Sequence, residues 1–203
     1  MSEMGIRVLR CIRHGRSAAN YAHGRFLGTD RMNAALDSYD EAGIARPERV
    51  LVPIAADASV ISSDAPRAVE TAAAVTGRPS ETIHKVPLFR EVPLPRFKSR
   101  FLYLPPGAFL ALGRAGWALG CLEASETSSE TKARVRQAIA YLDRKFTTHV
   151  EIVLFSHCFF MRCLQWQLSK RGWSSASLRP FGFFEERTIR SDGAKMVSRK
   201  VAS

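Results

Sequence analysis

An arginine and a histidine stand together where a short apolar segment reaches its first turn, a placement that suits phosphate chemistry. The segment, residues 6–12, is rich in β-branched side chains and reads as a strand. An Arg-His-Gly triplet at residues 13–15 follows directly, with Ser17 and Asn20 shortly after it. A guanidinium offers several planar donors to phosphate oxygens, and a neutral imidazole can attack phosphorus. Alone, the triplet would be interpreted as a solvated turn, so its meaning depends on the rest of the chain.

A second strand-to-helix turn carries another arginine. Residues 59–62 are predicted to form a strand and residues 63–75 a helix, for which Asp64 or Ser63 can supply the N-cap. This places Arg67 in the first turn of the helix, beside free backbone N–H groups and the positive end of the helix dipole. The position suits an anion, although a single arginine there could equally face solvent.

A third turn ends in a histidine. Residues 151–157 form a nearly continuous apolar run, as in a strand covered on both faces, and the run ends at His157. The stretch that follows, from Cys158 to Lys170, has apolar residues at helical spacing. Ligands bind at the carboxyl ends of strands in open α/β sheets, so the three turns predict one convergent cationic cluster.

At these residues the chain resembles the histidine phosphatase superfamily, also called the phosphoglycerate mutase-like family. The matching stretches follow the order found in the family and comprise residues 13–20, 62–72, 89–91 and 155–157. The match is poor from residue 92 to residue 123. The resemblance implies that His14 is the nucleophile and is transiently phosphorylated, and that Glu91 is the proton donor. It assigns the binding of the phosphoryl oxygens to Arg13, Asn20, Arg67 and His157.

The physical chemistry of these residue types agrees with the implied roles. A histidine attacks phosphorus only through a neutral ring nitrogen, and nearby arginines disfavour its protonated form. Negative charge on the transferred group must be stabilised during the reaction. Two guanidinium groups can provide this stabilisation, so no metal or other cofactor is expected. Glu91 could instead form a surface ion pair with Arg90. Asp64 is the alternative proton donor, although its position suits helix capping better.

The chain departs from the usual pattern of the family at two positions. Arg16 stands where an acidic residue or glutamine is usual, which would make the mouth of the pocket more basic and favour a substrate with several negative charges. Cys158 follows His157 in place of a small residue. Cys158 and Arg162 also suggest a cysteine-dependent phosphatase, but only three residues separate them, too few for a phosphate loop of five residues.

Length and composition favour one catalytic domain over residues 1–203. The chain is 46% hydrophobic and has four cysteines without metal-ligand spacing, and nothing at its start reads as a signal peptide. A cytoplasmic protein is the simplest interpretation. The net charge of +11 favours anionic partners, but no nucleic-acid-binding motif is present, so we expect a small phosphorylated substrate and no nucleic acid. The oligomeric state is not predicted.

The predicted architecture is a three-layer α/β/α sandwich with a mainly parallel sheet, phosphoglycerate mutase-like, with a helical cap insertion. The cap is expected at residues 93–122, which are rich in proline, aromatic and basic residues, over the pocket where they would set substrate choice. Residues 107–122 are apolar enough for membrane contact but too short and interrupted for stable insertion. Capping-box spacing at residues 127–130 predicts another helix, and residues 185–190 and 195–201 predict a hairpin at the sheet edge.

Three hypotheses for the function follow. The first is a metal-independent phosphomonoester hydrolase acting through a phosphohistidine. The second is a phosphomutase, which would have to protect the phosphohistidine from water. The third is a non-catalytic protein that binds a phosphorylated ligand, an interpretation that loss of His14 or Glu91 would have favoured.

Overall fold

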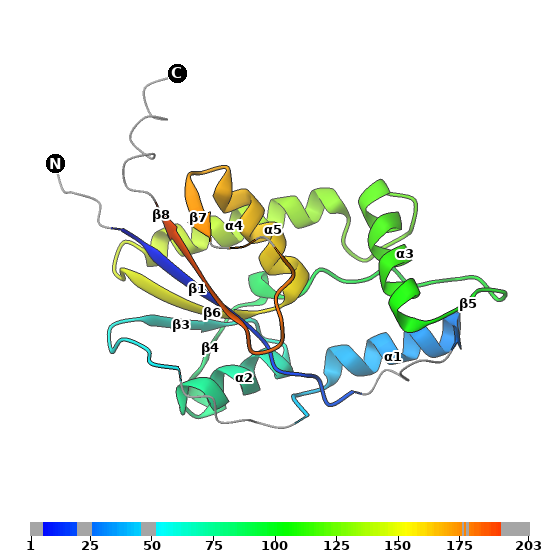
Figure 1. Ribbon diagram of the computed structural model, residues 1–203, viewed down its shortest axis with the longest axis horizontal. Helices are drawn as coiled ribbons and strands as arrows, with labels where there is room; N and C mark the ends of the chain where they lie inside the picture. Colours follow the sequence, from blue (N-terminus) through cyan, green and yellow to red (C-terminus); the bar gives the residue numbers. More distant parts are fainter. Residues whose placement is uncertain (1–5, 20–25, 46–51, 176, 178, 192–203) are drawn as a thin grey trace, which may run out of the picture.

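The protein folds as a mixed α/β structure around a six-stranded sheet (Figure 1). The computed structural model describes residues 6–19, 26–45, 52–175, 177 and 179–191. In chain order the strands of this sheet are β1 (Val8–Arg13), β3 (Ser59–Ser62), β4 (His84–Lys85), β6 (Glu151–Ser156), β7 (Trp173–Ser175) and β8 (Glu186–Ser191). Their spatial order is β4-β3-β6-β1-β8-β7, with parallel pairing from β4 through β1 and antiparallel pairing of β8 with β1 and β7.

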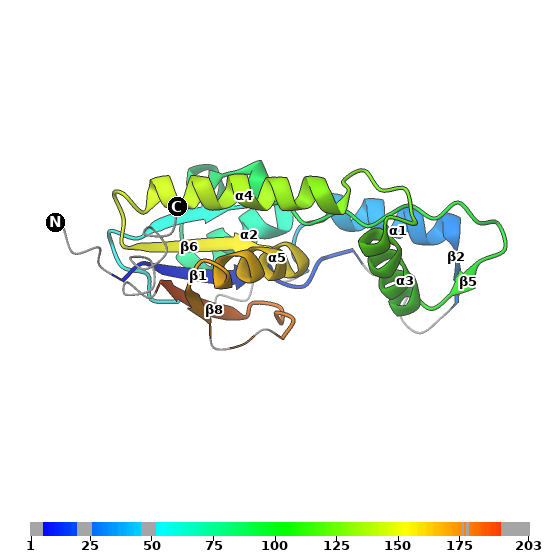
Figure 2. The same cartoon turned by 90° about the horizontal axis from the view of Figure 1, so that it is seen from above.

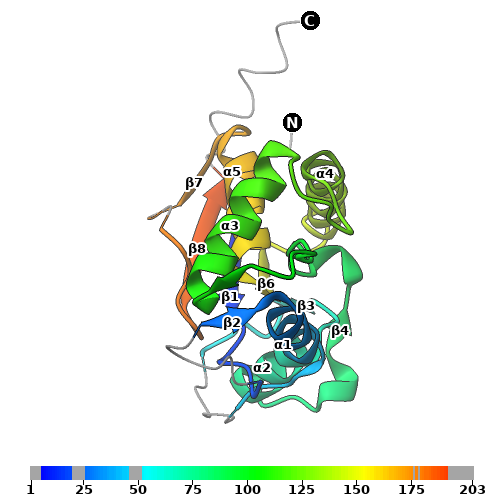
Figure 3. The same cartoon turned by 90° about the vertical axis from the view of Figure 1, so that its right-hand side faces the viewer.

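Helices cover both faces of this sheet, which gives three layers. The helices involved are α2 (Pro66–Thr76), α4 (Ser128–Lys145) and α5 (Cys158–Ser169), and Figure 3 shows α4 and α2 on opposite sides of the strands. The side chains of β6 alternate accordingly. Ile152 and Leu154 pack in the cluster that includes α4 and α5, whereas Val153 and Phe155 pack in the cluster that includes α2. The predicted sandwich with a mainly parallel sheet is therefore confirmed.

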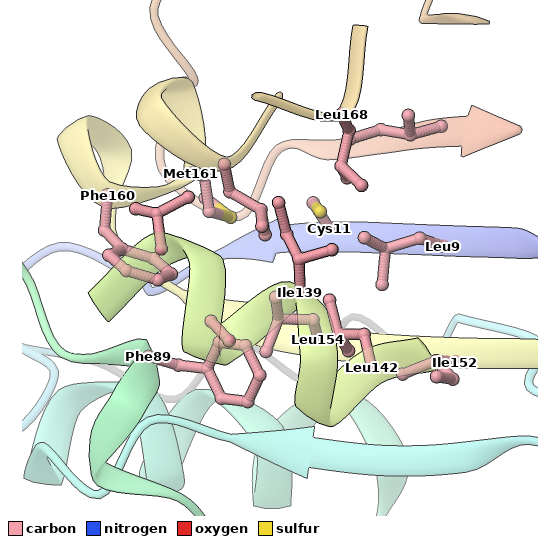
Figure 4. Packing of buried hydrophobic residues seen from close by; sticks show 14 of the residues in the cluster. Leu9, Cys11, Phe89, Ile139, Leu142, Ile152, Leu154, Phe160, Met161 and Leu168 are labelled. Carbon is pink, nitrogen blue, oxygen red and sulfur yellow. The ribbon is translucent and has the colours of Figure 1, made fainter. Parts of the chain in front are cut away.

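The larger hydrophobic cluster fills the space beneath α4 and α5 (Figure 4). Leu9 and Cys11 of β1 meet Ile139 and Leu142 of α4 there, all with at most 2% of their surface exposed. Phe89, at the end of the short helix η2 (Pro87–Phe89), packs its ring edge-on to Phe160 of α5. This packing fixes the start of α5 relative to the strand ends.

A second group of elements lies away from the sheet (Figures 1 and 2). It consists of α1 (Thr29–Glu41), α3 (Pro106–Leu119) and the two-stranded pair β2 (Leu27–Gly28) and β5 (Tyr103–Leu104). Met32 of α1 and Phe109 of α3 are buried in one small cluster with Phe97. We call this group the distal lobe. Residues 93–122, the expected cap, contribute β5 and α3 to it.

The structure bears out most of the expected local elements. The predicted strands correspond to β1, β3 and β6, and the predicted helices to α2, α4 and α5. The capping box of α4 is present, with Thr127 accepting from the N–H of Glu130 and the Glu130 side chain accepting from the N–H of Thr127. Gly77 ends α2 in a left-handed conformation with a φ of 68°.

Two local predictions are wrong. Neither Ser63 nor Asp64 caps α2, because its N-cap residue is Ala65, which has no side chain that could accept. The expected hairpin at the sheet edge is replaced by pairing of β8 with β1 on one side and β7 on the other, so β8 lies inside the sheet. The second strand expected for this hairpin, residues 195–201, lies outside the described residues.

The hydrophobic core generates a stability prediction. Leu154→Ala would leave a cavity between fully buried side chains, so we expect the free energy of unfolding to fall by about 2–5 kcal/mol. Leu119→Ala, at the 77% exposed end of α3, is the matched control and should change it by less than about 0.5 kcal/mol. Urea denaturation measures both, and equal effects of the two substitutions would contradict the described core.

Candidate active site

Three adjacent parallel strands bring the predicted site residues to one edge of the sheet. In register, Arg13 of β1 lies opposite Ser156 of β6, and Phe155 lies opposite Ser62 of β3. The residues that follow these strands, His14, His157 and Ser63, therefore emerge side by side. The rings of His14 and His157 have centroids 5.0 Å apart.

His14 is held as a neutral imidazole with a defined free nitrogen. Its side chain is buried, and its Nδ1 lies 2.7 Å from the carbonyl oxygen of Gly15, which can only accept. Nδ1 must therefore carry the proton, and Nε2 keeps its lone pair. Burial lowers the pKa of His14 to about 3, with smaller contributions from the positive charges of Arg67 and Arg13. Neutrality thus comes from burial first and from the arginines second.

Gly15 allows the turn after β1 to pack against a ring. A Cβ at this position would lie 2.4 Å from the Phe184 ring and 3.2 Å from Ile44, so any larger residue would displace its neighbours. The N–H of Gly15 donates to the Thr71 hydroxyl of α2 at 2.9 Å. These contacts fix the carbonyl that orients His14.

His157 offers one unpartnered nitrogen to a ligand. Its ring is fully buried, and Nε2 lies 3.0 Å from the hydroxyl of Ser63, while Nδ1 has no hydrogen-bond partner. The Ser63 oxygen accepts from the N–H of Ala65, and its proton can be donated to Nε2 of His157. In that tautomer Nδ1 carries the ring proton and is the donor available to a ligand. Burial lowers the pKa of His157 well below its ordinary value, and the positive charges of nearby groups lower it further.

The two arginines are anchored and keep unpaired N–H groups. Arg13 donates to the carbonyl of Phe181 at 2.6 Å, and the Phe183 ring centre lies 3.9 Å from its guanidinium carbon. Arg67 is buried and donates to the carbonyl of Tyr39 at 2.8 Å, at the end of α1. Among the described residues, buried side-chain polar atoms without a hydrogen-bond partner are Arg13 Nε, Arg67 Nε, Thr131 Oγ1 and His157 Nδ1. Three of these belong to this cluster, as expected where an anion binds.

Glu91 lies at the start of α5, where its carboxylate accepts backbone hydrogen bonds. Oε1 accepts from Phe160 at 2.8 Å and from Val92 at 2.9 Å, and Oε2 accepts from Phe159 at 3.1 Å. A carboxylate is stabilised by the positive end of a helix dipole. Oε2 accepts only one of these hydrogen bonds, so its second lone pair can take up a proton and release it to a substrate.

The structure contradicts the surface ion pair considered for Glu91 and the helix cap considered for Asp64. Glu91 does not form the surface ion pair with Arg90, because Arg90 instead donates to both carboxylate oxygens of Asp64. Asp64 also lines the cavity described next. The carboxylate of Asp64 therefore pairs with the Arg90 guanidinium and does not cap α2.

The cluster opens into a cavity of about 1710 Å³ that extends to the distal lobe. Arg13, Arg67 and Glu91 line its base, and Arg114 of α3 lines it from the lobe. Several lining cations are neutralised, since Arg90, Lys98 and Arg134 pair with Asp64, Glu123 and Glu126. Arg16 is exposed at the cavity and has no ion pair with any described residue.

Three residues at this site were not predicted in these roles. Tyr39 and Phe183 lie beside His14, with ring centroids 6.2 and 5.9 Å from its own, and Ser63 contacts His157. No motif surrounds Tyr39 or Phe183 in the sequence, and Ser63 had been interpreted only as a possible helix cap. Asn20, a predicted phosphate ligand, lies outside the described residues.

The described residues offer neither a cluster of metal ligands nor a membrane-spanning helix. No group of three or more His, Cys, Asp and Glu side chains is arranged to hold a metal ion. None of the described helices combines the length and apolar character that crossing a membrane requires.

The buried histidines generate a prediction about pH. Their folded-state pKa values lie below the unfolded value of about 6.5, so at lower pH the unfolded chain binds protons that the folded protein does not. Stability should therefore be complete above about pH 6.5 and fall as the pH falls, with His14 contributing about 2 kcal/mol of loss between about pH 7 and pH 5 and His157 acting in the same direction. His14→Gln should reduce this loss by about that amount in urea denaturation. An identical loss in the variant and in the wild type would contradict the burial of a neutral His14.

Comparison with known proteins places the chain in a family. The model of the histidine phosphatase superfamily (branch 1) matches residues 9–186. No curated protein sequence matches the chain. Solved structures share the fold at low identity. A mycobacterial glucosyl-3-phosphoglycerate phosphatase is 17% identical, with a TM-score of 0.59 over 92% of this chain and 91% of that one.

Two further structures extend this likeness. An Escherichia coli protein described as a candidate α-ribazole-5′-phosphate phosphatase is 18% identical, with a TM-score of 0.61 over 91% of this chain and 90% of that one. A Bacillus anthracis phosphoglycerate mutase is 16% identical, with a TM-score of 0.56 over 95% and 92%. These likenesses show the fold, and the family match covers most of the chain. The chain belongs to the histidine phosphatase superfamily, branch 1.

Proposed function

We propose that this protein is a metal-independent phosphomonoester hydrolase that acts through a phosphohistidine at His14. The observation that carries the proposal is the buried, neutral His14, whose Nδ1 is fixed by Gly15 so that Nε2 carries the lone pair needed for attack. The partnerless N–H groups of Arg13, Arg67 and His157 surround it. Family membership and phosphatase neighbours support the same class of reaction.

In the first step, Nε2 of His14 bonds to phosphorus while the bond from phosphorus to the ester oxygen breaks. Arg13, Arg67 and His157 donate hydrogen bonds to the phosphoryl oxygens, whose charge dominates the barrier. The leaving alkoxide takes a proton from Glu91. In the second step, Glu91 accepts a proton from water, and the resulting hydroxide bonds to phosphorus while the bond from phosphorus to Nε2 breaks. The electron pair of that bond returns to Nε2, and inorganic phosphate leaves.

The substrate we propose is a small phosphorylated molecule with a second anionic group. Arg16 reaches the cavity without an ion-pair partner among the described residues, so a second negative charge can bind there. Residues 93–122 would act as a cap that selects the rest of the substrate, because Leu94, Lys98 and Arg114 line the same cavity. The volume of about 1710 Å³ accommodates such a molecule together with water, which favours hydrolysis over phosphoryl transfer between substrates.

We propose a cytoplasmic location. The observation that favours it is that all four cysteines, Cys11, Cys121, Cys158 and Cys163, are free thiols in the structure, as a reducing compartment would keep them.

The nucleophile is tested by hydrolysis of an aryl phosphate in excess chelator. The wild-type protein should remain active, and His14→Ala should lose activity by at least about 10⁴-fold because no covalent intermediate can form. His84→Ala, which removes an exposed histidine on β4, is the matched control and should leave the rate unchanged. Residual activity in His14→Ala near the wild-type rate would disprove the assignment. A wild-type protein inactive on all phosphomonoesters would favour a mutase or a binding protein.

The proton donor is tested by comparing Glu91→Gln with Asp64→Asn. Glu91→Gln should lower kcat by about 10²- to 10⁴-fold, whereas Asp64→Asn should have a much smaller effect. The loss should shrink with aryl phosphates of increasingly acidic leaving groups, because these depart without a proton. A larger loss in Asp64→Asn than in Glu91→Gln would transfer the role to Asp64.

A further inference from the structure

The side chain of Tyr39 lies directly against the proposed nucleophile. Its hydroxyl is 3.5 Å from Nε2 of His14, the nitrogen that carries the lone pair, and the two rings meet edge-on with centroids 6.2 Å apart. Tyr39 belongs to the last turn of α1, so this contact joins the distal lobe to the sheet edge.

The same residue also contacts Arg67. Its ring centre lies 4.5 Å from the guanidinium carbon of Arg67. The Tyr39 carbonyl also accepts from Arg67 at 2.8 Å, which anchors this turn of α1. Tyr39 therefore contacts two of the groups that would surround a phosphoryl group, His14 and Arg67.

The Tyr39 hydroxyl lies close to the position that phosphorus must take. Before the bond to phosphorus forms, the phosphorus must come within about 3–3.5 Å of the attacking atom, in line with its lone pair. The Tyr39 oxygen already lies 3.5 Å from Nε2, where its proton can be donated to that lone pair. The phenol and phosphorus therefore compete for the lone pair of Nε2.

We propose that Tyr39 is a gating residue whose phenol fills the phosphoryl site of the free protein and must leave before a phosphorylated ligand can bind. The inference rests on the proposed function and deepens it. The cavity lined by Tyr39 gives the side chain space to leave the site. Movement of the phenol would open the path to Nε2 and free its lone pair.

The direction of a change in phosphate affinity distinguishes a gate from a ligand. Tyr39→Phe removes the hydroxyl but keeps the ring, so it weakens the closed state and should tighten binding of inorganic phosphate about 5-fold, the equivalent of one hydrogen bond. Tyr39→Ala removes the whole side chain and should tighten it further. If the hydroxyl instead bound phosphate, both substitutions would weaken binding.

The experiment measures the Kd of inorganic phosphate by isothermal titration calorimetry for the wild type, Tyr39→Phe and Tyr39→Ala. Tyr103→Phe, at an exposed tyrosine of β5, is the matched control and should bind as the wild type does. A second measurement follows modification of His14 by diethylpyrocarbonate with peptide mapping. His14 should react slowly in the wild type and at least several-fold faster in Tyr39→Ala, with His84 in the same sample as an internal reference.

Each outcome has one meaning. Tighter phosphate binding together with faster modification of His14 supports the gate. Weaker binding in Tyr39→Phe, or equal modification of His14 in the wild type and in Tyr39→Ala, overturns the gate while leaving the proposed function in place. Failure of every one of these proteins to bind phosphate would overturn the proposed function and the gate that rests on it. Should Tyr39→Ala not fold, the Tyr39→Phe titration still decides.

Discussion

The hydrogen bond from Nδ1 of His14 to the carbonyl of Gly15 is the contact on which the proposed chemistry depends. It decides which nitrogen carries the proton and therefore which one can attack phosphorus. Burial keeps the ring neutral, and the arginines that would hold the phosphoryl group add to this effect. The same positive charges thus serve twice, since they disfavour a protonated nucleophile and attract its anionic target.

The fold provides this arrangement through strand register rather than through local sequence. Parallel neighbours β1 and β6 end one beside the other, so His14 and His157 emerge together although they are far apart in the chain. The glycine after His14 lets Phe184 pack against the turn, and Thr71 of α2 holds its N–H. Packing of Phe89 against Phe160 fixes the start of α5, where the carboxylate of Glu91 is bound.

The sequence was sufficient to predict the elements whose signals are local. Strands β1, β3 and β6 are short apolar runs, and the turns after them carry the charged residues that were expected to converge. The contacts of Tyr39 and Phe183 could not be predicted, because they arise from the placement of a helix end and a loop that share no motif with the strand ends. Ser63 does not cap α2, because the helix begins at Pro66 with Ala65 as its N-cap, and the Ser63 hydroxyl contacts His157, a partner 94 residues away.

The measurement that tests the account most directly is rapid-quench trapping of the protein during turnover of a phosphate-labelled aryl ester, followed by peptide mapping. The account predicts label on the peptide that contains His14, stable in alkali and lost in acid, which appears and decays at rates compatible with turnover. Turnover without any labelled histidine, or with the label on His157, would contradict His14 as the nucleophile.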